Sequence, residues 1–174
     1  MKKLIVVRHS KSSWKDSSLS DFDRPLNKRG KRDGKKMSEF LSKCIKSIDL
    51  LLCSSSNRTI LTSKYYKDSL QIKNSIFTES LYHASKKEII ENFYNIDSSV
   101  NSILLIGHNP GLTEFINFST DENLFNLPTT GTVIIEYPIE KWIELEYVSG
   151  KVKLKKFPKP VSYTHMTLPT TLEV

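Results

Sequence analysis

Short apolar runs alternate with amphipathic segments along most of this chain of 174 residues. Leu4–Val7 is typical of a strand buried on both faces, and residues 49–56 ("DLLLCSSS") and 102–107 ("SILLIG") repeat the pattern. Asn27 can cap a helix whose buried stripe has the spacing i, i+3, i+4 and i+7: Met37, Phe40, Leu41 and Cys44. Strands that alternate with helices predict an α/β fold.

The remaining segments extend this pattern. Further helices are predicted at residues 57–70, 85–96 and 112–116, and short strands at 75–79 and 131–138. Residues 141–157 ("KWIELEYVSGKVKLKKF") predict two strands paired through a Ser149–Gly150 turn. We therefore expect a three-layer α/β/α architecture, with a mostly parallel central sheet and antiparallel strands at one edge.

The length of the chain fits one domain, which we place at residues 1–160. Residues 161–174 have neither helical nor strand periodicity and follow "FPKP", a sequence typical of a domain end. We interpret them as a non-native or disordered tail, and His165 within them is given no role.

Composition limits the class of protein. The formal charge of +7 favours anionic partners such as phosphorylated molecules, acidic proteins or nucleic acid. Two cysteines are too few for a disulfide framework. Arg8 interrupts the N-terminal apolar run too early for a signal peptide, and no run approaches the ~20 apolar residues that span a bilayer. The sequence predicts a cytoplasmic protein without a membrane partner.

Cationic side chains and imidazoles follow three of the predicted strands. His9 and His108 each come directly after an apolar strand, Arg8 precedes His9, and Arg58 follows the second strand at the start of a helix. In a parallel sheet these strand ends share one edge, where α/β folds bind ligands. Asn109 leads into a helix whose N-terminal N–H groups favour an anion. The sequence therefore predicts an anion site.

Three chemistries could use such a group of side chains. A metal site is disfavoured because guanidinium groups repel a divalent cation and no acidic residue lies close to either histidine in the sequence. Passive anion binding is possible. In the third, one imidazole attacks phosphorus while the other cationic groups neutralise the phosphoryl oxygens, a task that suits the planar fork of arginine.

Three motifs in combination, "VVRHSKS", "SSSNRT" and "IGHNPG", resemble the histidine phosphatase superfamily, branch 1, over about residues 3–160. The segment "DFDRPLNKRGKRDG" and the short chain are similar to its SixA-type phosphohistidine phosphatases. The resemblance implies a phosphoglycerate mutase-like fold and a phosphatase that needs neither metal nor cofactor. It implies that His9 is the nucleophile, transiently phosphorylated, and that Arg8, Arg58 and His108 complete the phosphate pocket.

The chain departs from the family pattern in two places. Ser10 stands where Gly or Ala is common, and the candidates for the general acid that protonates an ester leaving group are Glu79, by position but in surroundings that differ from the usual acidic motif, and His83, at a slightly different alignment. A weak or missing acid fits cleavage of a phosphorus–nitrogen bond better, because imidazole, with a pKa near ~6.5, leaves far more easily than an alkoxide.

The sequence thus predicts hydrolysis of phosphohistidine on a protein, for example on a histidine phosphotransfer domain, and the short connections leave an open pocket for it. The alternative is a phosphomonoesterase of small phosphorylated metabolites with the same nucleophile. A non-enzymatic binder of phosphoprotein or nucleic acid lacks a recognition motif with interleaved aromatic residues. A cysteine-dependent phosphatase is disfavoured because four residues, not five, separate Cys53 from Arg58.

Four further features of the sequence could have either a structural or a functional role. Arg24 could bind phosphate or pair with Asp21 or Asp23. The basic residues between positions 28 and 36 are typical of a solvated helix face more often than of a docking surface. Trp14 and Trp142 are interpreted as packing residues rather than stacking platforms.

Overall fold

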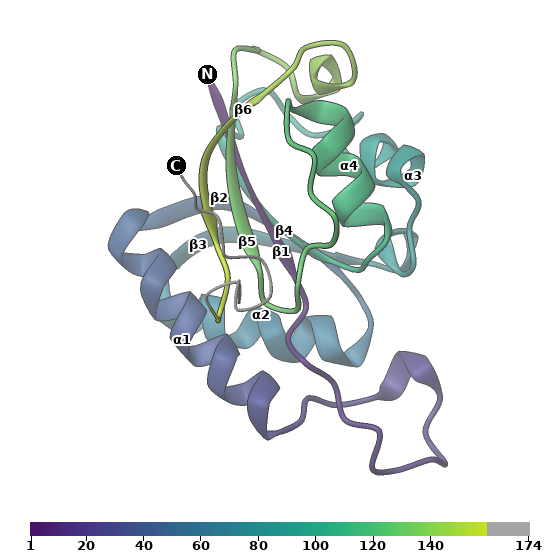
Figure 1. Ribbon diagram of the computed structural model, residues 1–174. Helices are drawn as coiled ribbons and strands as arrows, with labels where there is room; N and C mark the ends of the chain where they lie inside the picture. The colour runs from purple at the N-terminus through teal and green to yellow at the C-terminus, as the bar shows by residue number, and fades with distance from the viewer. Residues whose placement is uncertain (160–174) are drawn as a thin grey trace, which may run out of the picture.

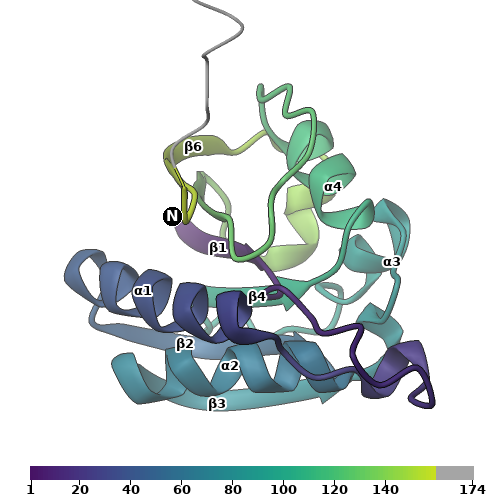
Figure 2. The same cartoon turned by 60° about the horizontal axis from the view of Figure 1, so that its bottom comes forward.

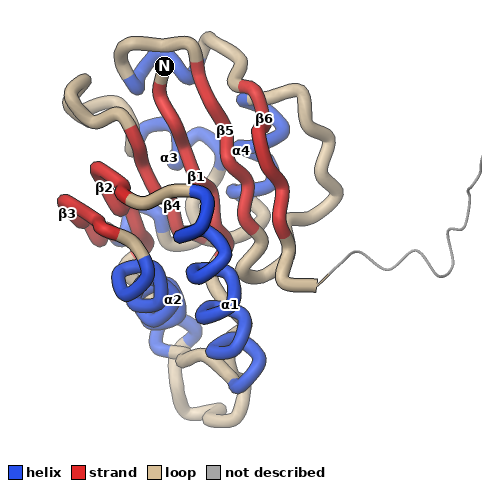
Figure 3. The backbone as a smooth tube through the Cα atoms, turned by 90° about the vertical axis from the view of Figure 1, so that its left-hand side faces the viewer, coloured by secondary structure: helices blue, strands red, loops and turns tan. Residues whose placement is uncertain are grey.

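The computed structural model describes residues 1–159, which form one mixed sheet covered by helices (Figure 1). The strands are β1 (Lys2–Arg8), β2 (Ser47–Ser54), β3 (Gln71–Thr78), β4 (Ser102–Gly107), β5 (Thr132–Tyr137) and β6 (Lys151–Lys156). Their order is β3-β2-β4-β1-β5-β6. The first four are parallel, and β5 and β6 continue the sheet by antiparallel pairing. Figure 3 shows β4, β1, β5 and β6 side by side. The predicted sheet is confirmed.

Helices cover both faces of this sheet (Figure 2). α1 (Lys28–Cys44) and α2 (Asn57–Ser69) lie on one face, and α3 (Lys86–Glu91) and α4 (Gly111–Ser119) on the other. Within residues 1–159 there are also three short 3-10 helices: η1 (Asp21–Asp23), η2 (Glu79–Leu81) and η3 (Trp142–Glu146). The three-layer α/β/α architecture expected from the alternating pattern is therefore confirmed.

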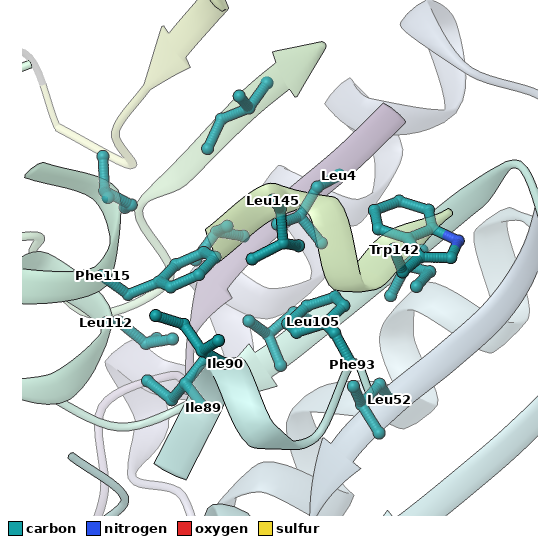
Figure 4. Packing of buried hydrophobic residues seen from close by; sticks show 14 of the residues in the cluster. Leu4, Leu52, Ile89, Ile90, Phe93, Leu105, Leu112, Phe115, Trp142 and Leu145 are labelled. Carbon is teal, nitrogen blue, oxygen red and sulfur yellow. The ribbon is translucent and has the colours of Figure 1, made fainter. Parts of the chain in front are cut away.

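Side-chain alternation in β1 explains the two cores. Leu4 and Val6 point to the face that carries α3 and α4, whereas Ile5 and Val7 point to the face that carries α1 and α2. All four side chains are fully buried, so each contributes about 1.5–3 kcal/mol relative to an exposed position. Figure 4 shows the larger core, in which Leu4 of β1 lies among apolar side chains of α3, α4 and η3.

The first helix begins where the sequence predicts. The Asn27 side chain accepts a hydrogen bond from the Gly30 N–H at 2.8 Å, which satisfies one of the free donors of the first turn. Met37 and Leu41 are buried as expected, but Cys44, at the end of the helix, is exposed. The helix is therefore held by the cap at one end and by apolar packing along its middle.

The strand predicted within residues 141–148 is wrong, because this segment contains a 3-10 helix instead. Trp142 and Leu145 are buried three residues apart on the 3-10 helix η3, and the Trp142 indole N–H donates to the Val100 carbonyl at 2.7 Å. Burial of these two side chains in the core outweighs the strand propensity of the segment. β6 pairs with β5 instead, and Trp142 is the packing residue expected.

Other boundaries differ from the predicted ones by smaller amounts. α3 ends at Glu91 rather than near position 96, and β3 begins at Gln71 rather than at position 75. β3 and β6 are the two open edges of the sheet, and β6 has the lysine-rich sequence "KVKLKK".

No helix within residues 1–159 combines the length and the apolar character that crossing a bilayer requires. The interpretation of residues 161–174 as a tail lies outside the described residues.

Candidate active site

A cavity of about 200 Å³ opens where the chain leaves β1, β2 and β4. It lies at the carboxyl edge of the parallel strands, the position at which open α/β sheets bind ligands. Eight of the side chains named in the sequence analysis line it: Arg8, His9, Trp14, Arg24, Arg58, His83, His108 and Asn109. Residues from segments more than fifty positions apart in the sequence thus share one small space.

Strand register explains why the two histidines meet. Arg8, the last residue of β1, pairs with Gly107, the last residue of the neighbouring parallel strand β4. The next residue on each strand is a histidine, and the His9 N–H donates to the Gly107 carbonyl at 3.1 Å. The ring centroids of His9 and His108 are 5.2 Å apart. The sheet itself therefore sets the distance between the two imidazoles.

His9 is held as a neutral imidazole with one unprotonated ring nitrogen. Its Nδ1–H donates to the Ser10 carbonyl at 2.7 Å, so the proton lies on Nδ1 and Nε2 carries the lone pair. Arg58 Nε donates to that nitrogen at 3.4 Å. Burial, opposed by the Ser10 hydrogen bond but reinforced by the nearby arginine charges, lowers the pKa of His9 to about 3. This geometry suits a nucleophile.

Backbone strain lies directly beneath this histidine. Thr130 has a φ of 60°, a conformation that is rare for a β-branched residue. Its N–H donates to the carbonyls of both Arg8 and His9, and its hydroxyl is 2.8 Å from the Ser10 hydroxyl. Such strain persists only where the surroundings impose it, and here it fixes the turn that presents His9 to the cavity.

His108 lies on the β2 side of the cavity. Its Nε2 is 2.8 Å from the Ser54 hydroxyl, while Nδ1 is buried without a hydrogen-bond partner in the described part of the chain. Burial and the charges of His9, Arg58 and His83 hold the pKa of His108 well below its usual range. A buried polar atom without a partner is costly.

Arg58 connects the cavity to the loop that precedes α1. It is the second residue of α2, and only 3% of it is exposed. Its Nη1 donates to the Asp21 carbonyl at 2.7 Å and its Nη2 to Asp21 Oδ2 at 3.0 Å. A single guanidinium thus contacts both the nucleophile candidate His9 and the Asp21 loop.

The Asp21 carboxylate accepts hydrogen bonds from several side chains around the site. Oδ1 accepts from Arg24 at 2.9 Å, and Oδ2 accepts from the Tyr82 hydroxyl at 2.6 Å and from His83 Nε2 at 3.0 Å. Partial burial alone would raise the pKa of this carboxyl, but the hydrogen bonds from Tyr82, Arg24 and Arg58 and the Arg58 charge outweigh it and hold the pKa well below its usual range. The carboxylate therefore stays ionised at any physiological pH.

Comparison with known proteins agrees with this geometry. The profile described as histidine phosphatase superfamily (branch 1) matches residues 4–81. Over 159 residues the chain is 31% identical to an uncharacterized chloroplastic protein of Arabidopsis thaliana, a match that covers 86% of this chain and 72% of that protein. The chain belongs to branch 1 of the histidine phosphatase superfamily. Its enzyme class is accordingly that of a phosphatase, as the sequence predicts.

Solved structures show the same fold around this histidine phosphatase site. A candidate phosphohistidine phosphatase SixA from Nakamurella multipartitia superposes with a TM-score of 0.79 at 20% identity, covering 90% of this chain and 96% of that one. A mycobacterial glucosyl-3-phosphoglycerate phosphatase superposes with a TM-score of 0.65 at 10% identity, covering 88% and 98%. At these identities the likeness shows the fold alone, and that fold is SixA-like.

Arg8, Arg24 and Asn109 line the cavity of the histidine phosphatase but are anchored elsewhere. Arg8 donates to the Leu127 carbonyl at 3.0 Å, and burial, followed by the Arg58 charge, lowers its pKa. Asn109 donates to the same carbonyl at 2.8 Å. Arg24 forms an ion pair with Asp21 rather than with Asp23 while it also lines the cavity, so both readings of this residue apply.

The two candidates for a general acid occupy different places. Glu79, at the start of η2, is exposed and does not line the cavity, so the structure does not bring it to the other site residues. His83 lines the cavity, and its ring centroid is 5.4 Å from that of His108. Its φ of 50° is a further strained backbone position at this site.

Cys53 does not take part in the cavity. It is fully buried in β2, its Sγ–H lies against the carbonyls of Ser54 and Thr59, and burial raises the pKa of the thiol to about 12. The prediction that Trp14 is a packing residue is wrong. Trp14 is 73% exposed, and the Arg24 guanidinium stacks on its ring at 3.3 Å from the centroid.

Sequence reasoning missed three residues that shape this site. The sequence indicates Asp21 only as a partner for Arg24, and it gives no sign of the contacts made by Tyr82 and Thr130. The only available signal was the run "DFDRPL", in which an acidic residue precedes an arginine by three positions. Tyr82 and Thr130 act through loop geometry, which no periodicity reveals.

Proposed function

We propose that this histidine phosphatase hydrolyses phosphohistidine on a protein through a phosphorylated His9. The observation that supports it most directly is the unprotonated Nε2 of His9, which lies in a cavity with Arg8, Arg58 and His108. Phosphoryl transfer needs positioning and charge stabilisation above all, and two guanidinium groups offer the bidentate contacts that suit phosphoryl oxygens.

The chemistry of the leaving group supports a phosphorus–nitrogen bond as the target. No Asp or Glu lines the cavity within the described residues, so an ester oxygen would lack a carboxylic acid as proton donor. An imidazole with a pKa near ~6.5 leaves far more readily than an alkoxide and needs less help from an acid. The open cavity also suits a phosphohistidine that projects from the surface of a protein.

The reaction has two displacements. In the first, the lone pair of His9 Nε2 attacks phosphorus, the bond from phosphorus to the substrate imidazole breaks, and that nitrogen keeps the electron pair and takes a proton from solvent. Arg58 Nε–H, which contacts Nε2 in the free enzyme, is then close to a phosphoryl oxygen. In the second, water attacks phosphorus, gives a proton to solvent, and the electron pair of the broken bond returns to Nε2.

Intact-mass spectrometry during turnover tests this proposal. Protein quenched without acid should carry one phosphoryl group on His9, and brief acid treatment should remove it because phosphorus–nitrogen bonds are acid-labile. A His9→Asn variant should show neither turnover nor the mass shift, while its circular dichroism stays that of the parent. Undiminished turnover by His9→Asn would contradict the proposal.

A phosphomonoesterase of small metabolites is the second candidate. His83 lines the cavity and could give a proton to an ester oxygen, and the mycobacterial glucosyl-3-phosphoglycerate phosphatase shares the fold. Relative kcat/KM on a phosphohistidine protein, sugar phosphates and nitrophenyl phosphate separates the two functions. Higher kcat/KM on the sugar phosphates than on the protein would favour this second function.

Two conditions of the activity are part of the same proposal. We infer that turnover needs no metal, since no group of three or more His, Cys, Asp and Glu side chains within residues 1–159 could hold one. Turnover should therefore be unchanged by EDTA. We also infer a cytoplasmic location, which fractionation of cells tests.

A further inference from the structure

A second, larger hollow of about 850 Å³ adjoins the catalytic cavity. It lies between the loop that follows His9 and the first turns of α1, and we call it the basic groove. Its cationic side chains are Lys11, Lys15, Lys28, Arg29 and Lys31. Lys11, Ser12 and Trp14 line both hollows, so a molecule in the groove would also reach the mouth of the cavity.

The charge of the basic groove is poorly compensated. No Asp or Glu lines it, and within the described residues none of its four lysines has a carboxylate within 4.0 Å. Arg29 alone is paired, with Asp33 at 3.6 Å. The nearby Asp16 carboxylate accepts instead from Ser18. Several unpaired positive charges in one hollow attract an anionic partner.

The same cations lie at the unfavourable end of a helix. The first turn of α1 has no acidic residue and begins with Lys28 and Arg29. The N-terminus of a helix carries partial positive charge, so lysines there are repelled where acidic residues would be stabilised. A bound anion would relieve this repulsion, because it adds the negative charge that the first turn lacks.

Trp14 gives the basic groove an aromatic anchor. The indole is exposed, and the buried Arg24 guanidinium holds one face of it. Arg24 is itself held by hydrogen bonds to Asp21, Ser12 and the Ser13 carbonyl. The indole therefore packs on a guanidinium that is fixed in place. Exposed tryptophans that are held in place are typical of protein interfaces.

We propose that the basic groove docks an acidic segment of the phosphoprotein, beside the phosphohistidine that enters the cavity. This inference rests on the proposed function and adds the chemistry of the partner. A single aromatic residue beside five cations suits carboxylate side chains better than stacked bases, which need successive aromatic platforms. Complementary charge of this kind acts mainly on the rate of association and on its dependence on salt.

Two synthetic phosphohistidine peptides test the inference, one flanked by Glu and one by Gln. At low salt the parent should turn over the Glu-flanked peptide with about tenfold higher kcat/KM, and the preference should fade as salt rises. The variant Lys15→Glu/Lys28→Glu/Lys31→Glu should lose the preference, and a milder variant with Gln at the same positions should lose most of it. All variants should turn over phosphoramidate at the parent rate.

The matched control reverses three exposed lysines far from the groove: Lys43, Lys46 and Lys151. It should keep the preference for the Glu-flanked peptide. Equal kcat/KM of the parent on the two peptides would overturn the inference, and so would loss of the preference in the control. A single-stranded oligonucleotide that inhibits better than an unphosphorylated Glu-rich peptide would overturn it in favour of nucleic acid.

Failure of the proposed function gives a different pattern. If the parent turns over neither phosphoramidate nor either peptide, the proposed function fails, and the groove is then judged by fluorescence anisotropy of a labelled, unphosphorylated Glu-rich peptide. Binding by the parent that the triple Glu variant loses supports the basic groove. Absence of binding by the parent overturns it.

Discussion

Acidification from pH 7 to pH 5 should destabilise this protein through two buried histidines. His9 and His108 are 7% and 3% exposed, and both have pKa values well below the usual 6.5. In that pH window the unfolded chain takes up a proton on each imidazole, whereas the folded protein keeps both neutral. The free energy of unfolding therefore falls as the pH falls.

The magnitude follows from the unfolded pKa alone, provided that the folded values stay below about 5. At pH 5 a group with a pKa of 6.5 gains about 2 kcal/mol from protonation in the unfolded chain, so His9 and His108 together cost about 4 kcal/mol. The carboxyl of Asp21, with its depressed pKa, is ionised in both states above pH 5 and contributes nothing there. For a chain of this length the loss corresponds to roughly 8–16 °C in Tm.

Urea unfolding followed by circular dichroism at pH 7, 6 and 5, in buffers without phosphate, measures this effect. The variant His9→Gln/His108→Gln should lose most of the pH dependence, because glutamine does not titrate. The reasoning is refuted if the parent loses less than about 1 kcal/mol between pH 7 and pH 5, or if the double variant loses as much as the parent.

Three further substitutions test other parts of the structure. Arg58→Lys keeps the charge but not the planar fork, so kcat/KM should fall about a hundredfold while the circular dichroism spectrum is retained; an unchanged kcat/KM would contradict the role given to this side chain. Cys53→Ser should keep turnover within about twofold, because the thiol is buried away from the cavity; loss of the phosphoenzyme in this variant would argue against His9. Gly30→Ala should lower the free energy of unfolding by about 1–3 kcal/mol, since a Cβ there would lie 2.1 Å from the Lys11 carbonyl oxygen, and equal urea midpoints would disprove that clash.

Strand periodicity predicted the sheet, and with it the meeting of His9 and His108. Both facts depend on the same physical rule, since apolar runs buried on both faces pair in parallel and end at one edge. The strand prediction for residues 141–148 failed because the segment has strand-forming residues but buries Trp142 and Leu145, which are three positions apart. Tertiary packing decided that element, and local propensity could not.

The polar contacts around the cavity were much less predictable. Glu79 and His83 are four positions apart, but only His83 turns into the cavity, through a backbone conformation with positive φ that the sequence does not mark. Asp21 reaches Arg58 and Tyr82 across gaps of 37 and 61 residues. Contacts of that kind depend on the path of a loop, which periodicity does not encode.

The lysine-rich strand β6 has a consequence for the protein at high concentration. It is an open edge of the sheet, and its backbone could in principle accept a strand from another copy of the chain. Its lysines at positions 151, 153, 155 and 156 would then face an equally charged strand across a few ångströms. Glu136 and Glu122 pair with Lys153 and Lys155, so the positive charge left over on this strand is that of Lys151 and Lys156, and its repulsion opposes such growth of the sheet between molecules.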